Sequence, residues 1–159
     1  MSLYFDDQGN LFPYQKSNLK ISECWDLFVN NFPASQTRQT LFDNLLRYRS
    51  AIFSELNQNF TQWINGSFAT QKLNPNDIDI ANLIPYNDAL DSKIETVLPY
   101  FTVGSSLETY QMDAHLIPVY DQTDPRFENT KLRLAYFEHW FGHDRNDNPK
   151  GFIEINEPW

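Results

Sequence analysis

The sequence predicts an α+β fold, an α/β sandwich in which helices pack on a small mixed β-sheet. Three observations lead to this class: segments with apolar residues at helical spacing, shorter segments in which apolar and polar residues alternate, and the mixing of both kinds along the chain. At 159 residues the chain has the length of one domain. We expect a single domain over residues 1–159, with an N-terminal arm and short helix over residues 1–34 and a core over residues 35–159.

The N-terminal part of the chain predicts an extended arm followed by a short helix. Residues 4–13 place apolar residues on both sides of a polar turn at Gly9, which indicates a loose hairpin, and Pro13 ends any pairing. A helix should begin near Ser22, which can cap it, and continue with apolar residues at helical spacing until Pro33 stops it. We therefore expect two small elements before the core.

The longest predicted helix runs from residue 35 or 37 to residue 57. An apolar stripe at helical spacing predicts it, made of Leu41, Leu45, Tyr48, Ile52 and Leu56. Charged residues lie off this stripe, and we expect a solvated flank that includes Arg38, Arg47, Arg49 and Glu55. We interpret this helix as a packing element and assign it no chemistry.

Strands and helices then follow one another to the end of the chain. The predicted order is a strand at residues 60–64, a strand at 77–84, a helix from 87 or 88 to about 101, a turn at 104–106, a strand at 108–120, a helix at 129–141 and a short strand at 151–155. In the strand at residues 108–120, Met112 and Ala114 should point to one face of the sheet, and Asp113 and His115 to the other.

Composition narrows the expected location and partners. The formal net charge is −9 at pH 7 with a pI near 4.6, and such a surface repels nucleic-acid backbones, so broad nucleic-acid binding is not expected without a local basic pocket or a partner protein. The single cysteine, Cys24, rules out an internal disulfide and fits a reducing cytoplasm. No apolar run approaches the length of a membrane span, and no segment resembles a signal peptide. We expect a cytoplasmic protein with no membrane partner.

Most candidate functional residues lie in residues 63–80. Asn65 and Gly66 form a dipeptide that is favoured in tight hairpin turns, so a simple hairpin is one interpretation of this segment. In the other interpretation, Gly66 lets backbone N–H groups approach a phosphate while the Ser67 hydroxyl donates a hydrogen bond to it. The turn residues on their own leave both interpretations open.

Two acidic residues follow in the alternating sequence Asp77-Ile78-Asp79-Ile80, and a strand would place both carboxylates on one face. Neighbouring carboxylates repel each other and lose hydration, so such a pair usually requires a cation, although exposed acids at a strand end are common in an acidic protein. Asp113, on a later predicted strand, would join them if the two strands pair. We expect Asp77, Asp79 and Asp113 to hold Mg²⁺, with Mn²⁺ as a substitute, in a two-metal site with ions roughly 3.5–4 Å apart.

Basic residues near these acids are candidates for binding phosphate. Lys72 lies in the loop between the Gly-Ser turn and the acidic pair, near where a triphosphate would lie. The basic residues of the C-terminal part are interpreted as ordinary surface charges, namely Arg126, Lys131, Arg133, Arg145 and Lys150. Lys72 is therefore the one predicted phosphate-binding cation.

The three histidines give weaker signals. His139 and His143 are four residues apart and could share a helical face, but two ligands are fewer than a zinc site normally uses, so no zinc site is predicted. His115 shares a face with Asp113 and could contact a substrate, the alternative being a partly buried histidine with no such role.

The Gly-Ser turn, the Asp-Ile-Asp strand and the later strand acid together resemble the nucleotidyltransferase superfamily that includes DNA polymerase beta. The match is closest to an uncharacterised bacterial family of small nucleotidyltransferase-like proteins. Three segments carry this resemblance: the arm at residues 5–13, the core Trp-Ile-x-Gly-Ser-Phe-x-Thr-x-Lys at residues 63–72 with the acids up to Asp79, and the tail Phe-Gly-x-Asp-Arg-x-x-x-Pro-Lys-Gly at residues 141–151.

The resemblance implies a polymerase-beta-like nucleotidyltransferase core over the whole chain and assigns roles to these residues. Gly66 and Ser67, with Lys72 beside them, would seat a nucleoside triphosphate such as ATP. Asp77, Asp79 and Asp113 would be the metal-binding and catalytic acids. The implied reaction is Mg²⁺-dependent transfer of a nucleoside monophosphate to a hydroxyl of RNA or protein. Small members of the superfamily often work beside a partner protein in toxin–antitoxin or defence pairs, so a partner is also implied.

Two other functions stay open at this point. One is a catalytically silent nucleotide-binding or interaction protein that keeps the same fold. The other is a phosphohydrolase that uses the same metal site.

Overall fold

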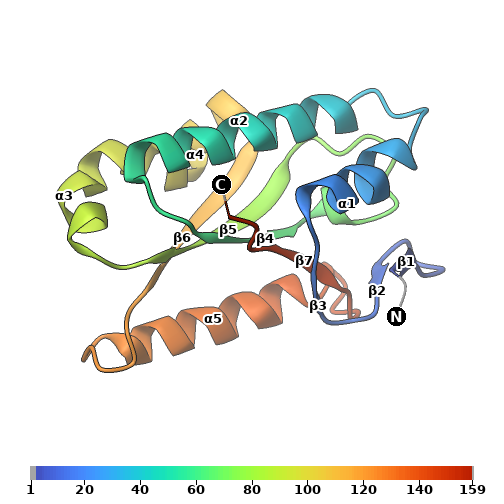
Figure 1. The fold of residues 1–159 in the computed structure, drawn as a ribbon. Helices are drawn as coiled ribbons and strands as arrows, with labels where there is room; N and C mark the ends of the chain where they lie inside the picture. The colour runs from blue at the N-terminus through green and yellow to red at the C-terminus, as the bar shows by residue number, and fades with distance from the viewer. Residues whose placement is uncertain (1–2, 159) are drawn as a thin grey trace.

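The computed structural model describes residues 3–158, and its centre is a five-stranded mixed sheet with the order β3-β7-β4-β5-β6 (Figure 1). Its strands are β3 (Lys16–Asn18), β4 (Thr61–Asn65), β5 (Ile78–Pro85), β6 (Met112–Val119) and β7 (Phe152–Ile155). β3 pairs with β7 and β5 pairs with β6 in parallel, while β4 is antiparallel to both of its neighbours. The expected N-terminal hairpin is formed by β1 (Tyr4–Phe5) and β2 (Leu11–Phe12). The α+β fold class is confirmed.

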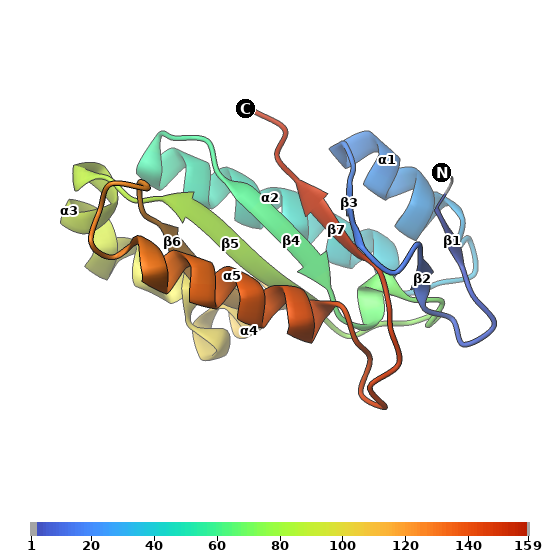
Figure 2. The ribbon, with the colours of Figure 1, turned by 90° about the horizontal axis from the view of Figure 1, so that it is seen from below.

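Helices cover both faces of the sheet. They are α1 (Ile21–Trp25), α2 (Arg38–Leu56), α3 (Asp88–Val97), α4 (Val103–Tyr110) and α5 (Phe127–Phe141), with a π-helical turn at Asp26–Asn30 and 3₁₀ turns at Ser67–Ala69 and Leu98–Phe101. Figures 1 and 2 show α5 alone on one face of the sheet, with α1 to α4 on the other. Among the described residues, no helix is both long enough and apolar enough to cross a membrane.

The period of two along the strands divides the apolar residues between two cores. Ile78, Ile80 and Ile84 of β5 are fully buried in the larger core, under the stripe of α2 that the sequence predicted. Ala81 of β5 and Ile117 of β6 point the other way into a smaller core beneath α5. The sheet is therefore buried on both faces.

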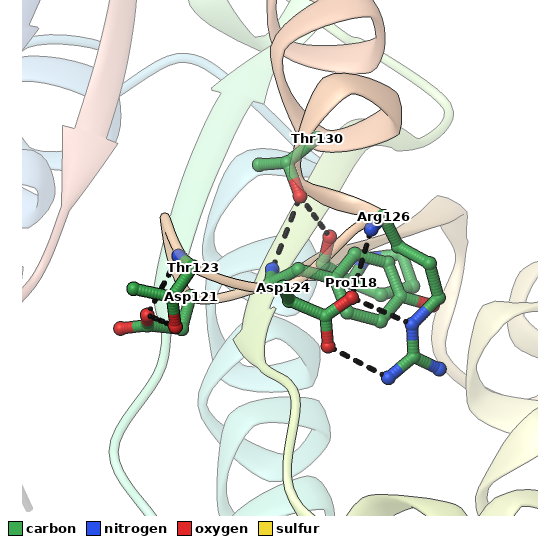
Figure 3. A network of polar contacts seen from close by, with 7 residues as sticks. Pro118, Asp121, Thr123, Asp124, Arg126 and Thr130 are labelled. Carbon is green, nitrogen blue, oxygen red and sulfur yellow. Dashed lines mark hydrogen bonds and ion pairs between the residues drawn. The ribbon is translucent and has the colours of Figure 1, made fainter.

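The connection from β6 to α5 is held by a network of polar contacts (Figure 3). The buried hydroxyl of Thr130 accepts a hydrogen bond from the Tyr120 backbone N–H and donates one to the Pro118 carbonyl, both at 3.1 Å. Arg126 donates to both oxygens of Asp124, and its guanidinium lies 4.3 Å from the ring centroid of Tyr120. These contacts fix the start of α5 against the end of β6.

The turn predicted at residues 104–106 is wrong, because these residues lie in α4. The Gly-Ser-Ser sequence is typical of a turn, but the Ser106 hydroxyl bonds to the Thr102 carbonyl at 3.0 Å, which allows this serine to be buried in a helix. Gln111, with a φ of 58°, then ends the helix in the left-handed conformation. The strand consequently begins at Met112 and not at residue 108. The other predicted elements are present with small shifts at their ends, and Asp77 lies just before β5.

The prediction of a solvated flank on α2 is wrong for two of its arginines. Arg38 and Arg49 are only 0% and 3% exposed, whereas Arg47 is exposed as expected. The Arg49 guanidinium donates to the side-chain carbonyl of Gln62 on β4. Arginine can be buried in this way when its guanidinium finds acceptors inside the protein, and the Nη1 and Nη2 groups of Arg38 donate to four backbone carbonyls.

Candidate active site

A cavity of about 770 Å³ lies at one end of the sheet. Its lining comes from the end of β4 and the turn after it, the first residues of β5 and β6, the last turns of α5, and the loop at residues 143–150. Figure 2 shows the end of β4 beside the C-terminal end of α5. Segments from the middle and the end of the sequence thus meet at one site.

Asp79 and Asp113 are the acidic centre of this cavity. They occupy directly paired positions on the parallel strands β5 and β6, and both line the cavity. Their side chains therefore lie side by side on one face of the sheet. Asp77 is half-buried just before β5 and is not part of the lining, although its charge acts on Asp79. The structure brings two of the three predicted acids together and leaves the third at the margin.

The environment of Asp79 disfavours its negative charge. Burial raises the pKa of this carboxyl to about 6, and the neighbouring charges of Asp113 and Asp77 contribute to the increase. Lys150 and Arg145 oppose it. A cation close to Asp79 and Asp113 would remove this repulsion, which fits a site for a hard divalent ion with oxygen ligands.

Gly66 packs directly against the Asp79 carboxylate. Its φ is +73°, and a Cβ atom at this position would lie 1.6 Å from Oδ2 of Asp79. Glycine is thus required both by the backbone conformation and by the carboxylate next to it. β4 and β5 are antiparallel neighbours, but residues 66–77 connect them, so the interpretation of Asn65-Gly66 as a tight two-residue hairpin turn is wrong. Gly66 instead begins a 3₁₀ turn at Ser67–Ala69 on the cavity wall.

Arg38 of α2 holds the loop that follows Gly66. Its Nη1 donates to the carbonyls of Phe28 and Phe68, and its Nη2 to those of Thr70 and Lys72, over distances of 2.7 to 3.0 Å. Burial lowers the pKa of Arg38 to about 10, so the guanidinium is charged at neutral pH. Lys72 thereby takes part through its backbone, and its exposed side chain lies outside the cavity lining.

Lys150 is a cation of the site that the sequence analysis missed. Its side chain is buried, lines the cavity, and donates from Nζ to the Gly66 carbonyl at 3.1 Å. Burial lowers the pKa of its ammonium group to about 8, while the charge of Asp79 works in the opposite direction. Arg145, also interpreted as a surface charge, lines the same cavity. The signal that could have identified both was their place in the tail segment at residues 141–151, which carries part of the family resemblance.

The loop that carries these two cations is fixed by Asp144. Its carboxylate accepts hydrogen bonds from the backbone N–H groups of Asn146 and Asn148 and from the side-chain amides of Asn148 and Asn10. The bonds to Asn148 and Asn10 hold the pKa of Asp144 well below its usual range. Because Asn10 belongs to the N-terminal hairpin region, the arm and the tail form one support for the cavity.

His115 lies beside Asp113, as its position on the strand predicted. Its Nε2 is 3.2 Å from Oδ1 of Asp113, but the angle does not fit a hydrogen bond, and both buried atoms have no hydrogen-bond partner among the described residues. Burial lowers the pKa of His115, which favours a neutral imidazole at pH 7. Oδ1 of Asn65 on the cavity wall is also buried without a hydrogen-bond partner in the described part of the chain. Such orphaned polar atoms are expected where a ligand binds.

The α5 side of the cavity has a different character. Tyr136 and Trp140 line it with aromatic rings that are 62% and 39% exposed, and the histidines at positions 139 and 143 lie next to them. The cavity is therefore lined by carboxylates and cations on the side of the sheet and the tail loop, and by aromatic rings and imidazoles on the side of α5.

Comparisons with known proteins give the family of the chain but no activity. A family model described as "Family of unknown function (DUF6932)" matches residues 3–156, almost the entire chain. No curated protein and no solved structure matches it.

Proposed function

The chain belongs to the DUF6932 family of unknown function, and from the geometry of its cavity we propose that it is a Mg²⁺-dependent nucleotidyltransferase of the cytoplasm. It moves a nucleoside monophosphate from a nucleoside triphosphate to a hydroxyl of RNA or protein. The observation that carries the proposal is the pairing of Asp79 with Asp113 on adjacent parallel strands, with Gly66 packed against Asp79. In this arrangement the two carboxylates would bind the metal ion, and the glycine turn beside them would bind the phosphates.

The phosphate side of the proposal rests on Gly66, Ser67, Lys150 and Arg145. Gly66 and Ser67 form a turn that lines the cavity, and a glycine turn of this kind can present backbone N–H groups to an anion. Lys150 and Arg145 line the same cavity and supply the positive charge that a triphosphate requires. These two cations replace Lys72, whose side chain lies elsewhere, in the predicted role.

The metal side rests on Asp79 and Asp113, which would hold the ion, with Asp77 adding negative charge nearby. The raised pKa of Asp79 and the Asp113 oxygen that has no hydrogen-bond partner among the described residues are both features that a bound cation would stabilise. A bound Mg²⁺ would supply Lewis-acid stabilisation of the charge on the phosphoryl oxygens.

The proposed reaction is a single substitution at the α-phosphorus of the triphosphate. The acceptor hydroxyl oxygen forms a bond to the α-phosphorus, the bond from this phosphorus to the bridging oxygen breaks, and pyrophosphate leaves with the electron pair. The hydroxyl proton passes to Asp113, whose Oδ1 lies 3.2 Å from Nε2 of His115. Lys150 and Arg145 balance the charge of the departing pyrophosphate.

The test is a transfer assay with each of the four α-³²P-labelled nucleoside triphosphates, in Mg²⁺ or Mn²⁺, against total cell RNA and protein. We expect label on one class of acceptor with the native chain, and a loss of at least about 100-fold with Asp79→Asn or Asp113→Asn, because a ligand to the metal is removed. Asp43→Asn, an exposed substitution on α2, is the matched control and should keep full transfer.

Three other results would contradict nucleotidyl transfer. Label that persists undiminished in both aspartate variants would place the activity elsewhere. Nucleotide binding without any transfer would favour a catalytically silent nucleotide-binding protein. Release of phosphate or pyrophosphate with no labelled acceptor would favour a phosphohydrolase.

A further inference from the structure

Two histidines and one aspartate gather on the α5 side of the cavity. His139 is in the last turn of α5, His143 lies two residues beyond its end, and Asp147 is in the following turn. One ligand atom from each of the three lies within 4.8 Å of the others. Sequence spacing alone had offered only the two histidines, and the turn supplies the third group.

The end of α5 explains why the two imidazoles are close. The final carbonyls of a helix have no partner within the helix, and Nδ1 of His143 lies 2.8 Å from the His139 carbonyl. The two ring centroids are 4.6 Å apart. If Nδ1 donates to this carbonyl, Nε2 of His143 carries the free lone pair. A backbone carbonyl that orients the far nitrogen in this way is the usual second support of a metal-binding histidine.

Asp147 is held in place by the fold and not by the other two side chains. Its backbone has a φ of +63°, which aspartate tolerates better than most residues. Its N–H donates to the Asp144 carbonyl at 3.1 Å, inside the loop that Asp144 organises. The third carboxylate is thus presented by a hydrogen-bonded turn.

We infer that His139, His143 and Asp147 form a binding site for a transition-metal ion, with Zn²⁺ as the best match. Two imidazoles and one carboxylate are a typical three-residue set for zinc with an open fourth position, whereas Mg²⁺ prefers oxygen ligands. Tetrahedral zinc needs ligand atoms about 3.4 Å apart, so the exposed side chains of His139 and Asp147 would move toward the half-buried His143 when the ion binds. This site goes beyond the proposed nucleotidyl transfer and does not depend on it.

The position of the site gives it a consequence for the cavity. All three residues line the cavity that contains Asp79 and Arg145. A bound ion would therefore add positive charge on the α5 side while joining the end of this helix to the loop that carries Arg145. The two metals would be chemically distinct, one held by carboxylates and one by imidazoles.

The test is calorimetric titration of Zn²⁺ into the full chain, without a purification tag and in a large excess of Mg²⁺, with Co²⁺ absorption as a second readout. We expect one Zn²⁺ per chain and a tetrahedral Co²⁺ band. The double variant His139→Gln/His143→Gln should weaken binding by at least about 100-fold, and Asp147→Asn by about 10-fold. Asparagine also tolerates the positive φ at position 147, so this variant should fold.

Glu138→Gln is the matched control, since it removes one exposed carboxylate next to His139 and should leave the affinity for zinc unchanged. Thermal unfolding of each variant checks that the fold is retained. The inference is overturned if the native chain binds no Zn²⁺. It is equally overturned if the folded double variant binds as tightly as the native chain, because the ion would then sit elsewhere, such as at His115.

Discussion

Asp79 is the residue on which the site depends most, and its position is unfavourable for the isolated chain. It is largely buried, lies next to Asp113, and is packed against Gly66 with no room for a side chain between them. Its ionised form is therefore destabilising in the absence of a cation. A strained group of this kind is typical of functional sites, where stability is given up for binding.

The first prediction concerns Asp79→Asn in the presence of EDTA. The pKa of Asp79 is raised from 3.8 to about 6 on folding, so its contribution to stability is fully present below about pH 4 and is lost as the pH rises through 6. Asparagine has no such loss. The variant should be more stable than the native chain at pH 8 by about 1–2 kcal/mol, a value reduced for the partial exposure of the group.

Urea denaturation at pH 8 and at pH 4 measures this difference. The gain should shrink toward zero at the lower pH. A variant that is less stable than the native chain at pH 8 would mean that the Asp79 carboxylate is a favourable partner of Lys150 and not a repelled one.

The sequence predicted the residues whose positions follow from a local period. Alternation on a strand fixes the face of each side chain, which indicated the face of Asp79 and of Asp113. Gly66 and Ser67, by contrast, were recognised as a turn, and Asp77, given the same face as Asp79, lies outside the cavity lining. Lys150 could not be predicted, since its role arises from a loop folded back onto the Gly66 carbonyl from far along the chain. Such a contact leaves no periodic signal.

At the scale of elements, the loop after β4 takes its shape from a helix packed over it. Arg38 at the start of α2 donates to four backbone carbonyls, three of them in residues 68–72. Its guanidinium also lies 3.9 Å from the ring centroid of Phe32. One side chain thus satisfies several backbone carbonyls of the loop at residues 67–72 and links this loop to the N-terminal helices.

The second prediction is that Arg38→Met destabilises the fold by about 3 kcal/mol or more, because it leaves several buried carbonyls without donors. Arg47→Met, on the exposed side of the same helix, is the matched control and should cost less than about 1 kcal/mol. Urea denaturation at pH 7 measures both. Equal losses for the two variants would show that the buried guanidinium has no special part in holding the loop.

Helix periodicity predicted the elements but not the burial of these arginines. The stripe of α2 is buried as expected, yet Arg38 and Arg49 are buried as well, because acceptors come from segments distant in sequence. The opposite error occurred at α4, where the Gly-Ser-Ser sequence indicated a turn. There Ser106 can be buried within a helix because its hydroxyl donates to the Thr102 carbonyl one turn earlier.

At the scale of the whole molecule, charge and topology act in different ways. The net charge of −9 repels anions over most of the surface. Within the cavity, however, the mixed sheet brings Asp79 and Asp113 to one end, and the tail closes over them with Lys150 and Arg145. A nucleotide would enter as a complex with its metal, since the cation offsets both the acidic site and the triphosphate.

The fold class of the whole molecule could be predicted from the sequence, but the full order of the strands in the sheet could not. Alternation and helical spacing indicated an α+β sandwich. The pairing of the N-terminal β3 with the C-terminal β7 joins the two ends of the chain and was not predicted. This pairing places the C-terminal tail beside the N-terminal arm, where Asn10 donates a hydrogen bond to Asp144 of the cavity loop.

The most direct test of the proposed metal and nucleotide site is the anomalous scattering of Mn²⁺ in crystals soaked with Mn²⁺ and a triphosphate whose α–β bridge cannot be cleaved. We predict an anomalous peak in contact with both Asp79 and Asp113, and the triphosphate between this peak, the Gly66 turn and Lys150. Manganese found only at His139, His143 and Asp147, with no nucleotide at the paired aspartates, would contradict the proposed function.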